Sequence, residues 1–188
     1  MINKKDVIKK EKNLNLPNIL AAFRIALAPL MLWFMVDQSN PIFDGWHSSW
    51  FDYFAGLIFV IASITDFFDG YIARAWNQMT KLGSILDPLA DKMLVLAGFI
   101  GLLVIDRASA FAIFLILSRE FFITGLRVVA VAEGKSVAST MAGKIKTVVQ
   151  MIAIGFLIMN WPYATELLWF AVLLTLYSGY EYIRDYLK

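Results

Sequence analysis

The sequence contains no cysteine and a single histidine, His47, among its 188 residues. The missing cysteines exclude disulfide bonds, thiol catalysis, cysteine-ligated zinc and iron–sulfur clusters. One histidine also excludes a metal site built from several imidazoles. Charged residues are scarce at 17%, and the net charge of +2 is too small to indicate a nucleic-acid-binding protein.

Apolar residues, by contrast, are abundant. They make up 60% of the chain, and the mean hydropathy is +0.66, whereas soluble domains are about 45–50% apolar. A soluble domain of this size could not bury so much apolar surface, because small domains bury the smallest fraction of their chain. The composition therefore predicts an integral membrane protein.

Six apolar runs of nearly the length that crosses a bilayer follow Pro17. Helices are expected, because lipid cannot satisfy unpaired backbone groups and the alternation of a β-barrel is absent. We predict an all-α bundle of six transmembrane helices that forms one domain over 18–188. The expected helices are 18–37, 50–75, 82–105, 108–132, 139–160 and 163–184.

Residues 1–17 form a separate lysine-rich segment, with five lysines between positions 4 and 12. Two interpretations remain open for it: a helix that lies on an anionic membrane surface, or a solvated cytoplasmic tail. With six spans, all of the 17 Lys and Arg residues except Arg107 fall on the side of both termini. The positive-inside rule then places both termini in the cytoplasm and the protein in the cytoplasmic membrane.

Four aspartates lie inside these apolar runs, where charges are costly and usually functional. Asp66 and Asp69 share one helical face of the second run, and Asp87 and Asp91 share one face of the third. A short connection would join the two runs as an antiparallel hairpin. We therefore expect four carboxylates to converge on one pocket near the cytoplasmic side. Taken alone, Asp87 before Pro88 could instead cap a helix.

Converging carboxylates repel each other unless cations compensate them. Oxygen ligands without Cys or His suit Mg²⁺ or Mn²⁺, and a pair of such ions is typical of phosphoryl chemistry. Gly70 and Ala73, on the face of Asp66 and Asp69, leave room for a ligand, and Arg74 could bind a phosphate. The pattern predicts a phosphoryl-transfer site with two divalent cations.

The string Asp66-x₂-Asp69-Gly70-x₂-Ala73-Arg74-x₈-Gly83-x₃-Asp87-x₃-Asp91 resembles the signature of the CDP-alcohol phosphatidyltransferase family. The resemblance extends to six membrane helices and to an N-terminal Pro17-Asn18…Arg24 element. It implies that Asp66, Asp69, Asp87 and Asp91 bind metal and that Asp91 is the general base. It also implies a homodimer, and it implies a donor nucleotide and diphosphate held by Asn18, Asp66, Asp69, Gly70, Ala73 and Arg74.

Basic residues follow in the fourth and fifth runs and could bind an acceptor that carries its own phosphate. The candidates are Arg119, Arg127, Lys135 and Lys144. For Arg119 the alternative is an ion pair with Glu120, and for Lys135 and Lys144 it is membrane topology, to which we assign Lys146. Residues 118–127 and 143–147 are similar to the family members that join CDP-diacylglycerol to sn-glycerol 3-phosphate.

Other functions remain possible at this point. Inositol phosphate, serine or phosphatidylglycerol could be the acceptor. A cation or proton transporter could use the same acids, although transporter sites usually lie near the midplane of the membrane. A membrane scaffold would leave the aspartate pattern without a cause.

Overall fold

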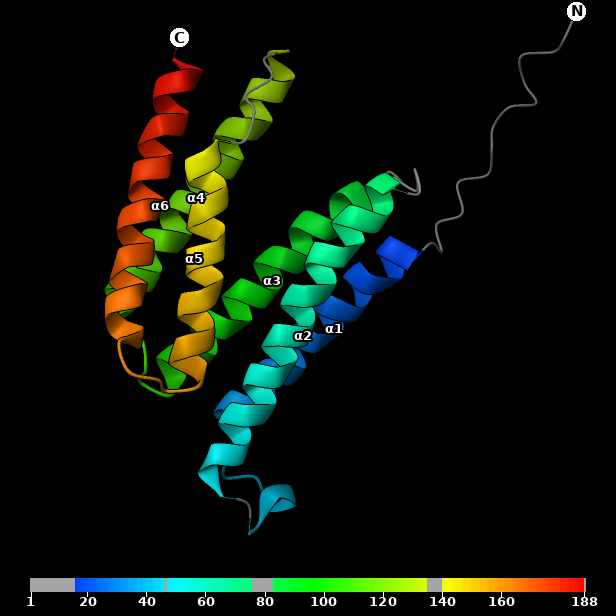
Figure 1. The fold of residues 1–188 in the computed structure, drawn as a ribbon, viewed down its shortest axis with the longest axis vertical. Helices are drawn as coiled ribbons and strands as arrows, with labels where there is room; N and C mark the ends of the chain where they lie inside the picture. Colours follow the sequence, from blue (N-terminus) through cyan, green and yellow to red (C-terminus); the bar gives the residue numbers. More distant parts are fainter. Residues whose placement is uncertain (1–15, 46, 76–82, 135–139, 188) are drawn as a thin grey trace, which may run out of the picture.

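Six α-helices and one short 3₁₀-helix make up the part of the chain that the structure, a computed structural model, describes (Figure 1). That part comprises residues 16–45, 47–75, 83–134 and 140–187, of which 42, 67–75, 84–85 and 131 are described by their backbone alone. The elements are α1 (Leu16–Val36), η1 (Pro41–Phe43), α2 (Ser48–Ala75), α3 (Gly83–Val104), α4 (Ala110–Ala132), α5 (Met141–Ile158) and α6 (Ala164–Tyr186).

The predicted all-α fold is thus confirmed within the described residues, and each helix begins and ends within two residues of its predicted run. The expected domain border at residue 17 does not coincide with the start of a helix. Because α1 begins at Leu16, the expected border between 1–17 and 18–188 falls inside a helix. Proline is tolerated in the first turn of a helix, where its missing N–H would have no partner, so Pro17 can belong to α1. The remainder of the lysine-rich segment lies outside the described residues.

The helices form two groups of three. In the first, α1 packs closely against both α2 and α3, which touch each other less. In the second, α6 packs against α4 and α5. Helix α5 also contacts α2 and α3 and so joins the groups, which converge at the lower end of Figure 1 and diverge towards the upper end.

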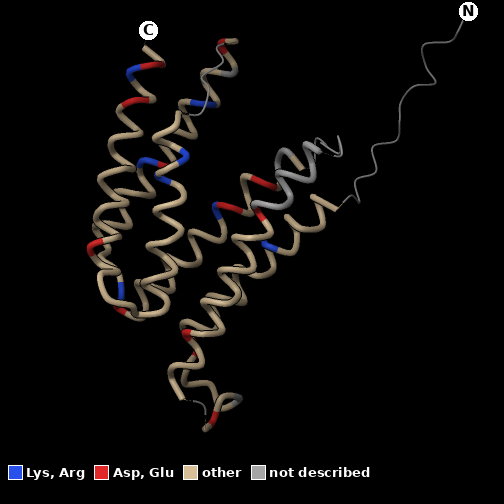
Figure 2. Tube along the Cα trace, in the orientation of Figure 1, with Lys and Arg blue, Asp and Glu red and all other residues tan. Residues whose placement is uncertain are grey.

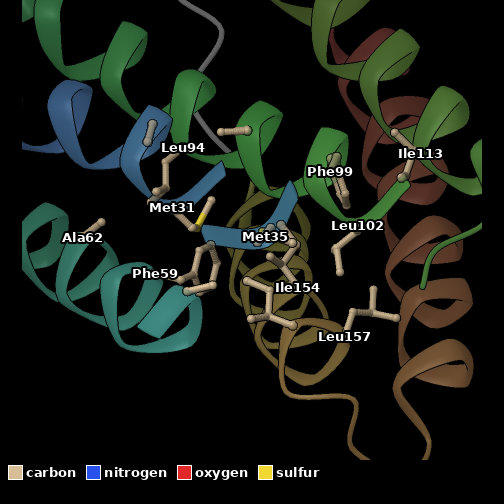
Figure 3. Close-up of a cluster of buried hydrophobic side chains, with 14 of the residues drawn as sticks. Met31, Met35, Phe59, Ala62, Leu94, Phe99, Leu102, Ile113, Ile154 and Leu157 are labelled. Atoms are coloured by element: carbon tan, nitrogen blue, oxygen red, sulfur yellow. The ribbon is translucent and has the colours of Figure 1, made fainter. Parts of the chain in front are cut away.

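The apolar core lies where the two groups meet (Figure 3). Met35 of α1 and Phe59 of α2 lie beside Ile154 of α5, and Met31 of α1 lies beside Leu94 of α3. Small residues let the helices approach, as is usual in membrane bundles. A Cβ atom on Gly101 of α3, for example, would lie 2.7 Å from the Met35 sulfur.

An ion pair ties the two groups together at their convergent end. Arg107, in the loop between α3 and α4, donates from its two Nη atoms to the Asp52 carboxylate of α2 at 2.8 and 2.9 Å. It also donates to the carbonyl oxygen of Ile158, the last residue of α5, at 2.6 Å. Arg107 is the basic residue that the charge count had set apart on the outer side.

Three of the described helices are long and apolar enough to cross a membrane: Leu16–Val36, the Ser48–Asp66 part of α2, and Met141–Ile158. Helices α3 and α4 have similar lengths but carry three charged residues each (Asp87, Asp91 and Lys92; Arg119, Glu120 and Arg127). Large apolar side chains such as Phe114 and Val128 are exposed on the surface of the bundle. These features indicate a membrane protein.

Candidate active site

Arg24 of α1 is the centre of the site, and its side chain is fully buried. Its Nη1 atom donates to the carboxylates of Asp66 on α2 and Asp91 on α3. Its Nη2 atom lies 4.0 Å from Oδ1 of Asp87, one turn before Asp91. Figure 2 shows this basic residue of α1 beside acidic positions of α2 and α3. Three of the four predicted carboxylates therefore converge, but they do so on an arginine from a third helix.

Among the described side chains of this cluster, three carboxylates lie around one guanidinium. Each contacts Arg24 on one side, yet the side chains of Asp66, Asp87 and Asp91 remain 38%, 40% and 48% exposed. Oδ1 of Asp87 is itself buried and has no hydrogen-bond partner in the described part of the chain. Several carboxylate oxygens gathered at one place are the type of ligand that a hard divalent cation prefers.

A divalent cation would fit between these carboxylates only with an additional ligand or after a shift of Arg24. Among the described side chains, no three acidic or imidazole groups by themselves surround a position for a metal ion. Arg24 lies between the carboxylates, and the side chain of the fourth predicted ligand, Asp69, is outside the described set. The carboxylate oxygens of Asp66, Asp87 and Asp91 are of the type that a divalent cation prefers, but with Arg24 between them they do not by themselves form a metal site.

The remaining donor-site residues lie on two helices. Asp69, Gly70, Ala73 and Arg74 belong to the final turns of α2, so the helix that sets their common face is present, but their side chains lie outside the described set. Asn18 is buried on α1, six residues before Arg24.

Asp87 is not a helix cap. Helix α3 begins at Gly83, four residues earlier, and continues through Pro88. The capping interpretation of Asp87 is therefore wrong, and its carboxylate is available to the site. Proline in this position lacks an N–H for the ladder of the helix, a cost that the packing of α3 against α1 offsets.

Arg119, a predicted acceptor ligand, is held between α4 and α6. Its Nη2 atom donates to the Ser178 hydroxyl at 2.9 Å, and Nη1 lies 3.5 Å from Glu120. The side chain crosses Gly179, where a Cβ atom would lie 3.2 Å from Cγ of Arg119. The ion pair with Glu120 is thus present, while the buried Nε of Arg119 has no hydrogen-bond partner among the described residues.

The other predicted acceptor ligands are more open. The Arg127 guanidinium lies over the ring of Tyr182 on α6, 5.9 Å from its centroid, as in a cation–π contact. Lys144 is exposed in the first turn of α5. Lys135 lies outside the described residues.

Three further charged residues have contacts that the sequence did not predict. Arg24 entered only through the N-terminal element, although an arginine inside an apolar run was a signal in itself. Lys146, assigned to topology, is buried and pairs with Glu120 across α5 and α4. Lys92, next to Asp91, donates from Nζ to the Thr124 hydroxyl of α4 at 3.0 Å. Sequence spacing could not reveal the last two contacts because they join different helices.

An apolar groove of 820 Å³ lies between α2 and α5. Ser63 and Ile64, which line one end on α2, immediately precede the turn that carries Asp66. Tyr53 lies near the start of α2, about 17 Å along the axis from Ile64. The groove thus connects the level of the carboxylates to the opposite half of the bundle.

Comparison with known proteins adds a family match to this geometry. The family model described as CDP-alcohol phosphatidyltransferase matches residues 14–177. The chain is 42% identical to the "CDP-diacylglycerol--glycerol-3-phosphate 3-phosphatidyltransferase" of Bacillus subtilis, with 89% of this chain and 93% of the relative covered. Relatives of the same name from Rickettsia felis and Escherichia coli K12 are 38% and 37% identical, over 90% of this chain and 94% and 93% of their own.

Proposed function

Because the chain belongs to the CDP-alcohol phosphatidyltransferase family, we propose that it transfers the phosphatidyl group of CDP-diacylglycerol to sn-glycerol 3-phosphate. The products are phosphatidylglycerophosphate and CMP. The observation that carries the proposal is the convergence of Asp66, Asp87 and Asp91, all members of the family signature, on Arg24. Relatives of almost the same length whose names state this reaction support the choice of donor and acceptor.

The metal ligands in this proposal are Asp66, Asp69, Asp87 and Asp91. When bound, two Mg²⁺ or Mn²⁺ ions supply positive charge against the carboxylates and the donor diphosphate. Arg24 holds Asp66 and Asp91 on one guanidinium group and so fixes the spacing between α2 and α3. Asn18, Gly70, Ala73 and Arg74 complete the donor site around the nucleotide and its diphosphate.

Asp91 acts as the general base. Its carboxylate pairs with Arg24, and its side chain is 48% exposed, so it can be reached from outside the bundle. The carboxylate accepts the proton of the acceptor hydroxyl, whose oxygen forms a bond to the phosphorus that bears diacylglycerol. The bond from that phosphorus to the bridging oxygen breaks, and this oxygen leaves with CMP.

The lipid part of the donor suits the groove between α2 and α5, which begins one turn from Asp66 and is lined by apolar side chains. A headgroup at the carboxylates would then leave an acyl chain lying along α2 within the membrane.

The proposal includes the arrangement of the protein in the membrane. All six helices cross the cytoplasmic membrane, with both termini and the carboxylates on the cytoplasmic side, where Lys and Arg gather. The lysine-rich residues before α1 form a cytoplasmic or interfacial segment, and the protein is a homodimer, as the family resemblance implies. Arg119, Arg127, Lys135 and Lys144 bind the phosphate of the acceptor.

Release of CMP from CDP-diacylglycerol by the purified protein tests this function. The acceptors to be compared are sn-glycerol 3-phosphate, glycerol, inositol phosphate, serine and phosphatidylglycerol. We expect release with sn-glycerol 3-phosphate and only weak release with glycerol, because charge-assisted contacts to the phosphate are lost. Efficient use of another acceptor would overturn the acceptor assignment, and no release with any of them would overturn the transferase itself.

A further inference from the structure

Lys92 is a cation of the site region to which neither the family signature nor the proposed mechanism gives a role. It follows Asp91 directly on α3, and its ammonium reaches across to α4, where it donates to Oγ1 of Thr124 at 3.0 Å. The Thr124 hydroxyl in turn donates to the backbone oxygen of Glu120 at 2.7 Å. The acceptor lone pair of Thr124 is therefore turned to Lys92, which fixes the position of the ammonium.

The charge of Lys92 is not matched by an acid. Within the described part of the chain, no carboxylate lies within ion-pair distance of its Nζ, although the neighbouring Asp91 is bound to Arg24. Buried or half-buried cations elsewhere do have acids: Arg107 has Asp52 and Lys146 has Glu120. An ammonium has three donors, and the contact with Thr124 uses one of them. A half-buried cation with spare donors indicates an anionic ligand.

The position of Lys92 next to Asp91 indicates which anion its ammonium could bind. Successive helical residues are turned by about 100° and rise by 1.5 Å, so Asp91 faces Arg24 while Lys92 faces α4. The Asp91 carboxylate and the Lys92 ammonium thus lie on adjacent sides of α3, and one small ligand between them could contact both. The acceptor has the matching shape, because a three-carbon chain separates its reacting hydroxyl from its phosphate.

We propose that the Lys92 ammonium binds the phosphate of the acceptor while Asp91 receives the proton of its hydroxyl. This inference rests on the proposed function and adds a specificity-determining residue to it. Thr124 is a positioning residue, which holds the ammonium on the α4 side. The rotation of about 100° between these adjacent residues of α3 then sets the distance between the base and the phosphate.

The test is steady-state kinetics of the Lys92→Met variant with each substrate varied in turn. Methionine keeps most of the length of the side chain and removes its charge. We expect KM for sn-glycerol 3-phosphate to rise about 10- to 150-fold, the usual effect of losing one charge-assisted contact. KM for CDP-diacylglycerol should stay nearly the same. The preference for sn-glycerol 3-phosphate over glycerol should fall by a similar factor.

Two variants distinguish phosphate binding from a simple tie between helices. Thr124→Val removes the tie but keeps the charge, and it should raise KM for the acceptor only a few-fold. Lys92→Arg keeps the charge in a different shape and should recover part of the preference over glycerol. If Thr124→Val reproduces the loss seen in Lys92→Met, or if Lys92→Arg recovers none of it, Lys92 is structural and the inference is wrong.

Arg184→Gln is the matched control for removal of one positive charge. Arg184 is exposed near the end of α6 and pairs with Asp185, so its loss should leave both KM values unchanged. An unchanged acceptor KM in Lys92→Met, with an active wild type, would overturn the role of Lys92 and leave the proposed function standing. A wild type that releases no CMP with sn-glycerol 3-phosphate would overturn the proposed function and this inference with it.

Discussion

The two ends of the bundle each hold an arginine among carboxylates, but the balance of charge differs. At the convergent end Arg107 meets Asp52, one cation against one anion, and its remaining hydrogen bond goes to a backbone oxygen of α5. At the divergent end, in the part of the chain that the structure describes, Arg24 meets three carboxylates, each of which stays more than a third exposed.

The Arg107–Asp52 contact has the charge balance of a structural ion pair, whereas the cluster around Arg24 has that of a binding site. A bidentate pair in which both partners are satisfied stabilises the fold without inviting a ligand. A cluster with surplus negative charge is unfavourable until cations or cationic groups compensate it. The same two residue types therefore tie helices together at one end and gather several carboxylates at the other, where we propose that divalent cations bind.

Among the tests of this comparison, removal of divalent cations should have the largest effect, which is a loss of CMP release. We expect excess EDTA to abolish CMP release, because the surplus carboxylates and the donor diphosphate then repel each other. Added Mg²⁺ or Mn²⁺ should restore the activity. Removal of Ca²⁺ alone, with Mg²⁺ or Mn²⁺ left in the buffer, should not affect it. Full activity of the metal-stripped protein would contradict the two-metal proposal.

Replacing one acid at each end sharpens the comparison. Asp91→Asn keeps the shape of the side chain but cannot accept the proton, and it should lower kcat by about two to four orders of magnitude. Asp52→Asn removes the same charge at the convergent end and should leave kcat of the folded protein unchanged. Turnover with sn-glycerol 3-phosphate at saturating substrates measures both, and near-normal kcat in Asp91→Asn would refute its role as the base.

The smallest expected effect concerns stability. Arg107→Met leaves Asp52 without its partner and the Ile158 oxygen without its donor, which costs about 1.5–3 kcal/mol. The apparent melting temperature in detergent should fall by about 3–12 °C. Arg184→Gln, which breaks an exposed pair, should change it by much less. Equal shifts in the two variants would mean that Arg107 does not join the two helix groups.

Much of the helical framework could be predicted because its cause is local. An apolar run of membrane-spanning length must form a helix in lipid, and polar or turn residues must separate the runs. Two local signals conflict at the start of α3. The apolar run predicts a start at residue 82, whereas Asp87 followed by Pro88 has the pattern of a helix start; the helix begins at Gly83, so the apolar run is the better guide.

The candidate site could be predicted within single helices and across the short connection between two neighbouring runs, but no further. Asp87 and Asp91 share a face by helical geometry, and their convergence with Asp66 follows from the short connection between two apolar runs. Arg24 could not be placed among them, because 42 residues separate it from Asp66 and only the position of α1 between α2 and α3 brings the two side chains together. The contacts of Lys146 with Glu120 and of Lys92 with Thr124 are of the same kind.

The sequence by itself determined the class of the protein, the extent of its helices and the identity of its acidic residues, since hydropathy and helical spacing act over a few turns. The tertiary structure decided which cations those acids meet. Arg24 becomes the centre of the carboxylates, Arg107 a tie between helix groups and Lys92 a bridge to α4. The physical reason is that an ion pair forms only between charges brought within a few ångströms, and helix packing sets that distance.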